Sequence, residues 1–319
     1  MMCSTNYNSR STPLSLLVIE TSRKIIHNLL TRMQSAAKRG VIAITGANRG
    51  LGYALAERLL AAGSPYSTIL LCSRDLDKGK SAAAQLAAKY QQSTTKLEVL
   101  ALDTSQDASR DQFCSEIKKK FGTISSIVNN AGVMIKEPNL SVLQKTEQTA
   151  ATNLFGIMNI NDRLLDGDLL NSEGVILNIS SKLANSAFIR DQTIKDMASR
   201  LKTEEDLHQL YNYFLKQVRE DPAKKMFSPI FPFAEYGFLK LLLNKYTGIL
   251  ARDPRTTWKS IDVFSICPGW CKTDMGGQMA TQTPEQGTDV SYHLLTAEKS
   301  KLAEFNGKMV YKVGSAIEI

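Results

Sequence analysis

Short apolar runs and helical repeats alternate along most of this chain. Runs of mostly β-branched and aliphatic residues at 41–44, 67–73, 96–102, 124–129, 174–181 and 261–266 predict buried strands. Helical patterns follow at 51–60, where Leu51, Leu55 and Leu59 recur at a four-residue step, and at 77–90, 106–121, 146–163 and 284–296. An edge strand is expected at 307–313. The alternation predicts a doubly wound α/β fold with a mostly parallel seven-stranded sheet.

The first strand runs directly into a glycine-bearing turn, Thr45-Gly46-Ala47-Asn48-Arg49-Gly50-Leu51-Gly52. Gly46 permits the tight turn, Gly50 lets the backbone approach a pyrophosphate, and Gly52 lets the following helix lie close to the sheet. Phosphate oxygens would meet the positive end of that helix. The pattern predicts a Rossmann-type cofactor site formed by Gly46, Asn48, Arg49, Gly50, Leu51 and Gly52. A tight turn without a ligand is the alternative.

The end of the second strand indicates which dinucleotide is bound. An acidic residue is expected near Cys72 or Ser73 if the ribose carries a free 2′-hydroxyl, but Arg74 follows instead. An arginine attracts a 2′-phosphate, and Arg49 could add a second cation. We therefore expect NADP(H) rather than NAD(H), with a solvated loop charge as the alternative role for Arg74.

Later motifs extend the pattern. The Thr-Gly-x-x-x-Gly-x-Gly turn, Asn129-Asn130-Ala131-Gly132, Ser180-Ser181 and Tyr236-x-x-x-Lys240 together resemble the short-chain dehydrogenase/reductase family. The resemblance implies that Asp103 contacts the adenine amino group and that Asn130, Ala131 and Gly132 pass under the adenine ribose. It also implies that Asn153 holds a water of a proton relay, and that Ser181, rather than Ser180, is the catalytic serine.

Tyr236 and Lys240 lie one helical turn apart, on the same face of a predicted helix. A phenol with a pKa near ~10 is a poor acid–base group at neutral pH. A nearby ammonium favours the phenolate, so Lys240 is expected to lower the pKa of Tyr236. Lys240 is also expected to hold the hydroxyls of the nicotinamide ribose. The family usually has Thr or Ser at the position of Leu239.

Two further features resemble the carbonyl reductase branch of the family. The segment Pro268-Gly269-Trp270-x-Lys272-Thr273-Asp274-Met275 matches its nicotinamide loop, in which Pro268, Gly269 and Thr273 would bind the cofactor. Ser181 and Tyr236 are also unusually far apart, which predicts a helical insert at 182–235. In the branch such an insert covers a tetramer surface, so a monomer is expected. A substrate lid is the alternative, and the Phe/Pro-rich loop 227–233 could wall an apolar pocket.

Residues 1–39 stand apart from this pattern. Residues 1–11 are polar and predicted to be disordered, and residues 13–38 suggest an amphipathic helix. It could be a docked helix, a mitochondrial transit peptide, because it is basic and hydroxyl-rich, or a membrane-surface helix. Residues 40–319 are predicted to form a single domain.

Composition removes several other classes. The net charge is +8, of which residues 1–40 supply +5, so the domain gives no reason to expect a nucleic-acid partner. The five cysteines are scattered without a C-x-x-C pair, which suits a reducing, cytoplasmic compartment. The three histidines are far apart, and no metal site is expected.

These features lead to one functional hypothesis and its rivals. The hypothesis is an NADPH-dependent reductase that converts an apolar or aromatic ketone, aldehyde or quinone to the alcohol. The alternatives are a membrane-associated retinol-type or steroid-type dehydrogenase of the same family and a non-catalytic NADPH-binding regulator.

Overall fold

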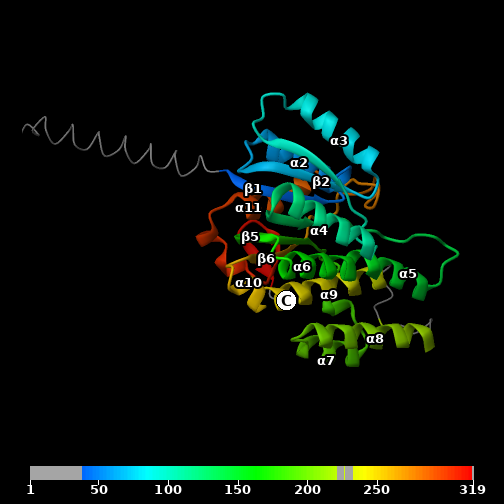
Figure 1. The fold of residues 1–319 in the computed structure, drawn as a ribbon. Helices are drawn as coiled ribbons and strands as arrows, with labels where there is room; N and C mark the ends of the chain where they lie inside the picture. The colour runs from blue at the N-terminus through cyan, green and yellow to red at the C-terminus, as the bar shows by residue number, and fades with distance from the viewer. Residues whose placement is uncertain (1–37, 221–225, 227–232, 318–319) are drawn as a thin grey trace, which may run out of the picture. The chain divides into compact units, whose positions relative to one another are not determined.

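A computed structural model describes residues 38–220, 226 and 233–317, which are built around one sheet (Figure 1). The strand order is β3-β2-β1-β4-β5-β6-β7-β8. The pairs β2–β3, β1–β4, β4–β5, β5–β6 and β6–β7 are parallel, and the last pair, β7–β8, is antiparallel. The strands are β1 (Arg39–Thr45), β2 (Tyr66–Ser73), β3 (Lys96–Ala101), β4 (Ile124–Asn129), β5 (Leu170–Ile179), β6 (Asp262–Ile266), β7 (Met309–Lys312) and β8 (Ser315–Ile317). The expected doubly wound, mostly parallel fold is confirmed.

The sheet contains one strand more than expected. Residues 307–313 were expected to form the edge, but the edge strand is β8, which runs antiparallel to β7. The two strands are joined through Gly314, whose φ of 77° lies in the left-handed region that favours glycine. A three-residue strand is too short to produce a readable alternation of apolar and polar positions.

Helices cover both faces of the sheet. One core packs α4 (Asp107–Phe121), α6 (Gly156–Asp166) and α9 (Ala234–Leu250) against the side of β1 that carries Val41 and Ala43. The other packs α2 (Gly50–Ala61), α3 (Leu76–Lys89) and α11 (Asp289–Thr296) against the side that carries Ile42 and Ile44. Burial of both faces explains why the strands read as continuous apolar runs.

The helix expected at 146–163 is broken in the middle. It consists of α5 (Val142–Ala150), a π turn (Ala151–Phe155) and α6. Asn153 lies in the π turn and is completely buried. A π turn in an α-helix accommodates an extra residue and often marks a functional site.

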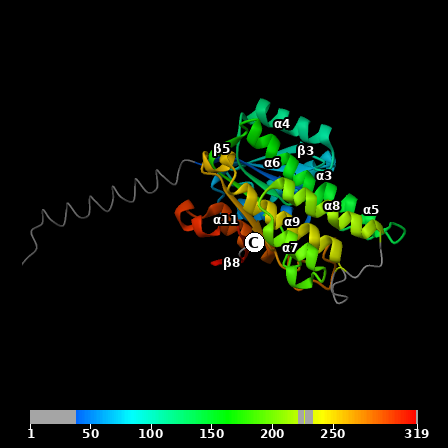
Figure 2. The same ribbon diagram turned by 90° about the horizontal axis from the view of Figure 1, so that it is seen from below.

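Two helices lie in the region predicted to be an insert. These are α7 (Gln192–Arg200) and α8 (Glu204–Glu220), and α8 packs on α5 and α9 (Figure 2). Thr203 caps α8, because its Oγ1 accepts a 3.1 Å hydrogen bond from the Asp206 N–H. Residues 227–232 of the predicted aromatic loop lie outside the described residues, and so does nearly all of the N-terminal extension.

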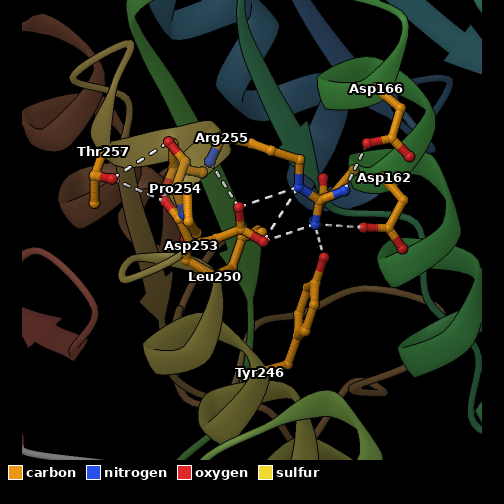
Figure 3. A network of polar contacts seen from close by, with 10 residues as sticks. Asp162, Asp166, Tyr246, Leu250, Asp253, Pro254, Arg255 and Thr257 are labelled. Atoms are coloured by element: carbon orange, nitrogen blue, oxygen red, sulfur yellow. Dashed lines mark hydrogen bonds and ion pairs between the residues drawn. The ribbon is translucent and has the colours of Figure 1, made fainter.

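A cluster of charges joins α6 to the segment that follows α9 (Figure 3). Arg255, in the short helix α10 (Pro254–Thr257), donates hydrogen bonds to Asp162, Asp166 and Asp253. Burial alone would raise the pKa of Asp253, but the hydrogen bonds from Arg255 hold that pKa below its ordinary value. The arginine therefore fastens the C-terminal end of α9 to the rest of this layer.

Among the described residues, no helix has both the length and the apolar character needed to cross a membrane.

Candidate active site

The glycine turn and the end of β4 are joined by hydrogen bonds. Thr45 Oγ1 accepts from the N–H groups of Asn130 and Ala131 at 2.9 and 2.8 Å. In return, the Asn130 side chain donates to the Thr45 carbonyl oxygen at 2.7 Å. Because β1 and β4 adjoin where the strand order reverses, the joined turns lie at the usual cofactor position of a doubly wound sheet.

The turn has the shape that a dinucleotide requires. Gly46 and Gly50 have φ values of 65° and 59°, which side chains rarely adopt. A Cβ added to Gly52 would lie 2.5 Å from Asn130 Nδ2 and 2.9 Å from the Gly46 oxygen. The glycines therefore leave a cradle at the start of α2 into which a pyrophosphate fits.

Two arginines stand beside this cradle. Arg74 follows the last residue of β2 and is exposed, and among the described residues it has no hydrogen bond or ion pair. Arg49 instead forms an ion pair with Asp274 of the predicted nicotinamide loop. Arg74 is thus the free cation that could meet a 2′-phosphate, and Arg49 would have to exchange its partner.

Asp103 follows β3, as expected for an adenine contact. Its Oδ1 accepts hydrogen bonds from the N–H and hydroxyl of Ser105, at 2.9 and 2.6 Å. These bonds fix the orientation of the carboxylate.

Asn153 connects the π turn to the backbone after Gly132. Its Oδ1 accepts from the Val133 N–H, and its Nδ2 donates to the Val133 carbonyl oxygen, both at 2.8 Å. The side chain therefore uses one donor and one acceptor of its amide to hold the backbone, and its role in holding a water stays a prediction.

The two serines after β5 have different surroundings. Ser180 is buried and donates to the Lys240 carbonyl oxygen at 3.4 Å. Ser181 is half-buried, and its Oγ accepts from the Leu183 N–H at 3.1 Å, which leaves its proton available to a ligand. The geometry favours Ser181, as expected.

Tyr236 and Lys240 are adjacent on α9. The Lys240 ammonium lies 5.7 Å from the centroid of the Tyr236 ring and donates to the Ile179 carbonyl oxygen at 2.6 Å. Burial lowers the pKa of Lys240 to about 8. Burial also raises the pKa of Tyr236, mainly by desolvation and further by Cys267. The expected lowering of the Tyr236 pKa is therefore wrong for this structure, in which desolvation of the buried hydroxyl is the largest cause of the shift.

The predicted nicotinamide loop contacts both the glycine turn and the segment that follows β4. Thr273 Cγ2 would lie 3.4 Å from a Cβ on Gly50, and Lys136 Nζ donates to the Met275 carbonyl oxygen at 3.2 Å. Gly269, with φ of 79°, lies directly against the side chain of Gln282. Thr273 is thus brought to the cofactor cradle, and the roles of Pro268, Gly269 and Thr273 stay predictions.

A small cavity lies between the segment that follows Ser181 and the start of α9. Leu183, Phe188 and Ile189 line it from the segment after Ser181, and Phe238 and Leu241 line it from α9. The lining residues are close in the chain to Ser181 and Tyr236. Residues 227–232 of the expected Phe/Pro-rich wall lie outside the described residues.

A buried amide network escaped sequence analysis. Asn129 Nδ2 donates to the side-chain oxygens of Asn161 and Asn178, at 3.0 and 2.9 Å, and Asn178 donates to Thr247 Oγ1 at 3.0 Å. The network joins β4, β5, α6 and α9, so it sets the position of the helix that carries Tyr236. Polar residues inside otherwise apolar runs were the available signal.

Comparison with known proteins shows which family the chain resembles. Residues 40–192 match the family model described as short chain dehydrogenase. Carbonyl reductase [NADPH] 1 of Mus musculus is 30% identical over 267 residues, which cover 81% of this chain and 91% of the relative. Carbonyl reductase [NADPH] 3 of Homo sapiens is 32% identical over 263 residues, covering 80% and 90%.

Solved structures show the same fold. Salutaridine reductase from Papaver somniferum superposes with a TM-score of 0.70 at 23% identity, covering 82% of this chain and 96% of that one. An NADPH-bound carbonyl reductase from chicken fatty liver gives a TM-score of 0.63 at 20% identity, covering 88% and 100%.

The chain belongs to the short-chain dehydrogenase family. Within that family it falls in the carbonyl reductase-like branch.

Proposed function

We infer that this protein is an NADPH-dependent oxidoreductase that reduces the carbonyl group of a small molecule to an alcohol. NADPH, when bound, supplies the hydride. We propose that Gly46, Asn48, Arg49, Gly50, Leu51 and Gly52 hold its pyrophosphate side, that Arg74 meets the 2′-phosphate, and that Asp103 and 130–132 hold the adenosine. Pro268, Gly269, Thr273 and Lys240 would hold the nicotinamide side.

Side chains at the end of β5, on α9 and in the π turn would carry out the remaining steps. Ser181 donates a hydrogen bond to the substrate oxygen and orients it. The Tyr236 hydroxyl gives its proton to that oxygen as the alcohol forms. Lys240, with its ammonium fixed by Ile179, stabilises negative charge that develops on Tyr236. Asn153 keeps the π turn in place for the return of a proton from water.

The observation that carries the proposal is the joint placement of Tyr236, Lys240 and Ser181 beside a glycine cradle with a free cation. Two hydrogen bonds connect Lys240 to the end of β5. Its ammonium donates to the Ile179 carbonyl oxygen, and its own carbonyl oxygen accepts from the Ser180 hydroxyl. A binding-only protein would not require a proton donor at this point.

The test is NADPH oxidation, followed at about 340 nm, with a panel of quinones and aldehydes. We expect turnover with NADPH that exceeds turnover with NADH, and a loss of about 10²–10⁴-fold in kcat for Tyr236→Phe. The Kd for NADPH should stay unchanged in that variant. NADPH binding without turnover across the panel would contradict the reductase assignment.

Assembly, location and domain limits are further parts of the proposal. The helices α7 and α8 lie within the predicted insert 182–235, which is expected to cover the tetramer surface of the family. This supports a monomer, and sedimentation of the purified protein would test it. Scattered free cysteines support a cytoplasmic protein; a mitochondrial location of the tagged full-length chain would overturn this. We retain residues 1–39 as an extension and 40–319 as one domain.

A further inference from the structure

A helix of the predicted insert contacts the turn that carries Asn153. Phe155, the last residue of the π turn, stacks on His208 of α8 with ring centroids 5.2 Å apart and ring planes inclined by 13°. Tyr211 of the same helix meets the Phe155 ring edge-on, at 4.8 Å and 83°. Two rings of α8 thus hold the end of the π turn.

The π turn requires such support. It holds one more residue per turn than an α-helix has, with poorer geometry, and so depends on tertiary contacts. On its other side, a Cβ added to Gly156 would lie 2.5 Å from the Thr104 carbonyl oxygen, so the turn is packed tightly against the segment after β3. Phe155 and Gly156 therefore confine the turn from two directions.

A return to regular α-helix would displace Asn153. Loss of one residue from the turn rotates the preceding side chains by about 100° relative to the following helix. The two 2.8 Å hydrogen bonds between the Asn153 amide and Val133 could not survive such a rotation. Val133 directly follows Gly132, which is expected to pass under the adenine ribose. This part of the cofactor site would therefore lose a contact that holds its backbone.

We propose that Phe155, held by His208 and Tyr211, is a positioning residue for the reaction, and that α8 thereby supports the active site from outside. The sequence suggested only that the insert covers an assembly surface or closes over substrate. This inference rests on the proposed function, because the part played by Asn153 belongs to it.

The experiment compares three variants of the full chain. Phe155→Leu removes the ring from the π turn and keeps an apolar side chain. Phe155→Tyr keeps the ring and should act as wild type. Phe214→Leu is the matched control, because Phe214 lies on α8 like His208 and Tyr211, but its ring stacks on Phe238 of α9, with centroids 4.1 Å apart.

Two readouts are measured, and one is independent of turnover. Hydrogen exchange of the Val133 amide should become about tenfold faster in Phe155→Leu, because its acceptor on Asn153 moves away. The kcat should fall about tenfold, with a smaller change in KM for the carbonyl substrate. In Phe155→Tyr, the Val133 exchange rate and kcat should equal those of the wild type. In Phe214→Leu, both should stay within about twofold of the wild type, even if the melting temperature falls as much as in Phe155→Leu.

Unchanged Val133 exchange in Phe155→Leu, or equal effects in Phe214→Leu, would overturn the inference. If the wild-type protein reduces no carbonyl, the proposed function fails, but Val133 exchange still decides whether α8 holds the turn.

Discussion

Lys240 donates a hydrogen bond from its ammonium to the carbonyl oxygen of Ile179, over 2.6 Å, inside the protein. Burial lowers the pKa of Lys240 to about 8, whereas it raises the pKa of Tyr236. As pH rises, Lys240 therefore loses its proton first, and Tyr236 stays protonated.

This order predicts the pH dependence of catalysis. Because the ammonium supports proton donation by Tyr236, kcat/KM for carbonyl reduction should be constant at neutral pH and fall by about tenfold per pH unit above about pH 8. The profile is measured from initial rates of NADPH oxidation. A profile that stays flat to about pH 10 would be inconsistent with a catalytic role for the Lys240 charge.

The neighbouring serines allow a matched test. Ser181→Ala should lower kcat by about 10²-fold, because the substrate oxygen loses a donor that is best aligned in the transition state. Ser180→Ala removes one buried hydrogen bond to Lys240 and should cost about 1 kcal/mol of stability. Steady-state kinetics and urea unfolding of both variants check this. A reversed order of the two kcat values would assign the role to Ser180.

Arg74 should determine the preference for NADPH. Arg74→Glu replaces an exposed cation by an anion. KM for NADPH should rise by about 10–100-fold, because the loss of one charge-assisted hydrogen bond weakens binding by about this factor. KM for NADH should change little. Lys80→Glu, at another exposed position, is the control with the same change of net charge. Equal effects of the two substitutions would show a general charge effect only.

Gly52→Ala should damage both stability and cofactor binding. The new Cβ would lie 2.5 Å from Asn130 Nδ2, so the turn must shift, at a cost of about 1–3 kcal/mol. The Kd for NADPH should rise about tenfold or more. The Cβ of Gly248→Ala on α9 would approach nothing closer than the Gly307 oxygen at 3.4 Å, so this variant should be equally or slightly more stable. Thermal melting and NADPH fluorescence titration measure the two effects.

Arg255→Met tests the charge cluster below α9. Without the arginine, Asp162, Asp166 and Asp253 repel one another, and the free energy of unfolding at neutral pH should fall by about 2 kcal/mol, a value reduced for partial exposure.

The loss should shrink in acid. Asp253 has a lowered pKa in the folded protein, so its contribution is present at neutral pH and disappears as pH falls through that pKa. Urea unfolding near neutral pH and near about pH 3, below the ordinary pKa of an aspartate, measures the difference. Lys301→Met breaks only an exposed pair with Glu298 and should change stability by less than about 0.5 kcal/mol at either pH. An effect of Arg255→Met that is independent of pH would exclude the charge explanation.

The sequence by itself determined the parallel part of the sheet, the cofactor turn and the candidate positions for the chemistry. Strands buried on both faces read as continuous apolar runs, and glycines at Gly46, Gly50 and Gly52 have few alternatives, because their backbone angles or packing leave no room for a Cβ. The spacing of Tyr236 and Lys240 follows from helical geometry alone. Such local constraints leave direct traces in the order of residues.

Only the tertiary structure decided the rest. The pKa of Tyr236 depends on how deeply the packed chain desolvates its hydroxyl, and the pairing of Arg49 with Asp274 joins residues 225 positions apart. The π turn at Asn153 and its contact with α8 depend likewise on packing between distant segments, because an α-helix and a π turn share nearly the same local preferences. These properties are energies of contact between distant parts of the chain, and no short stretch of sequence contains them.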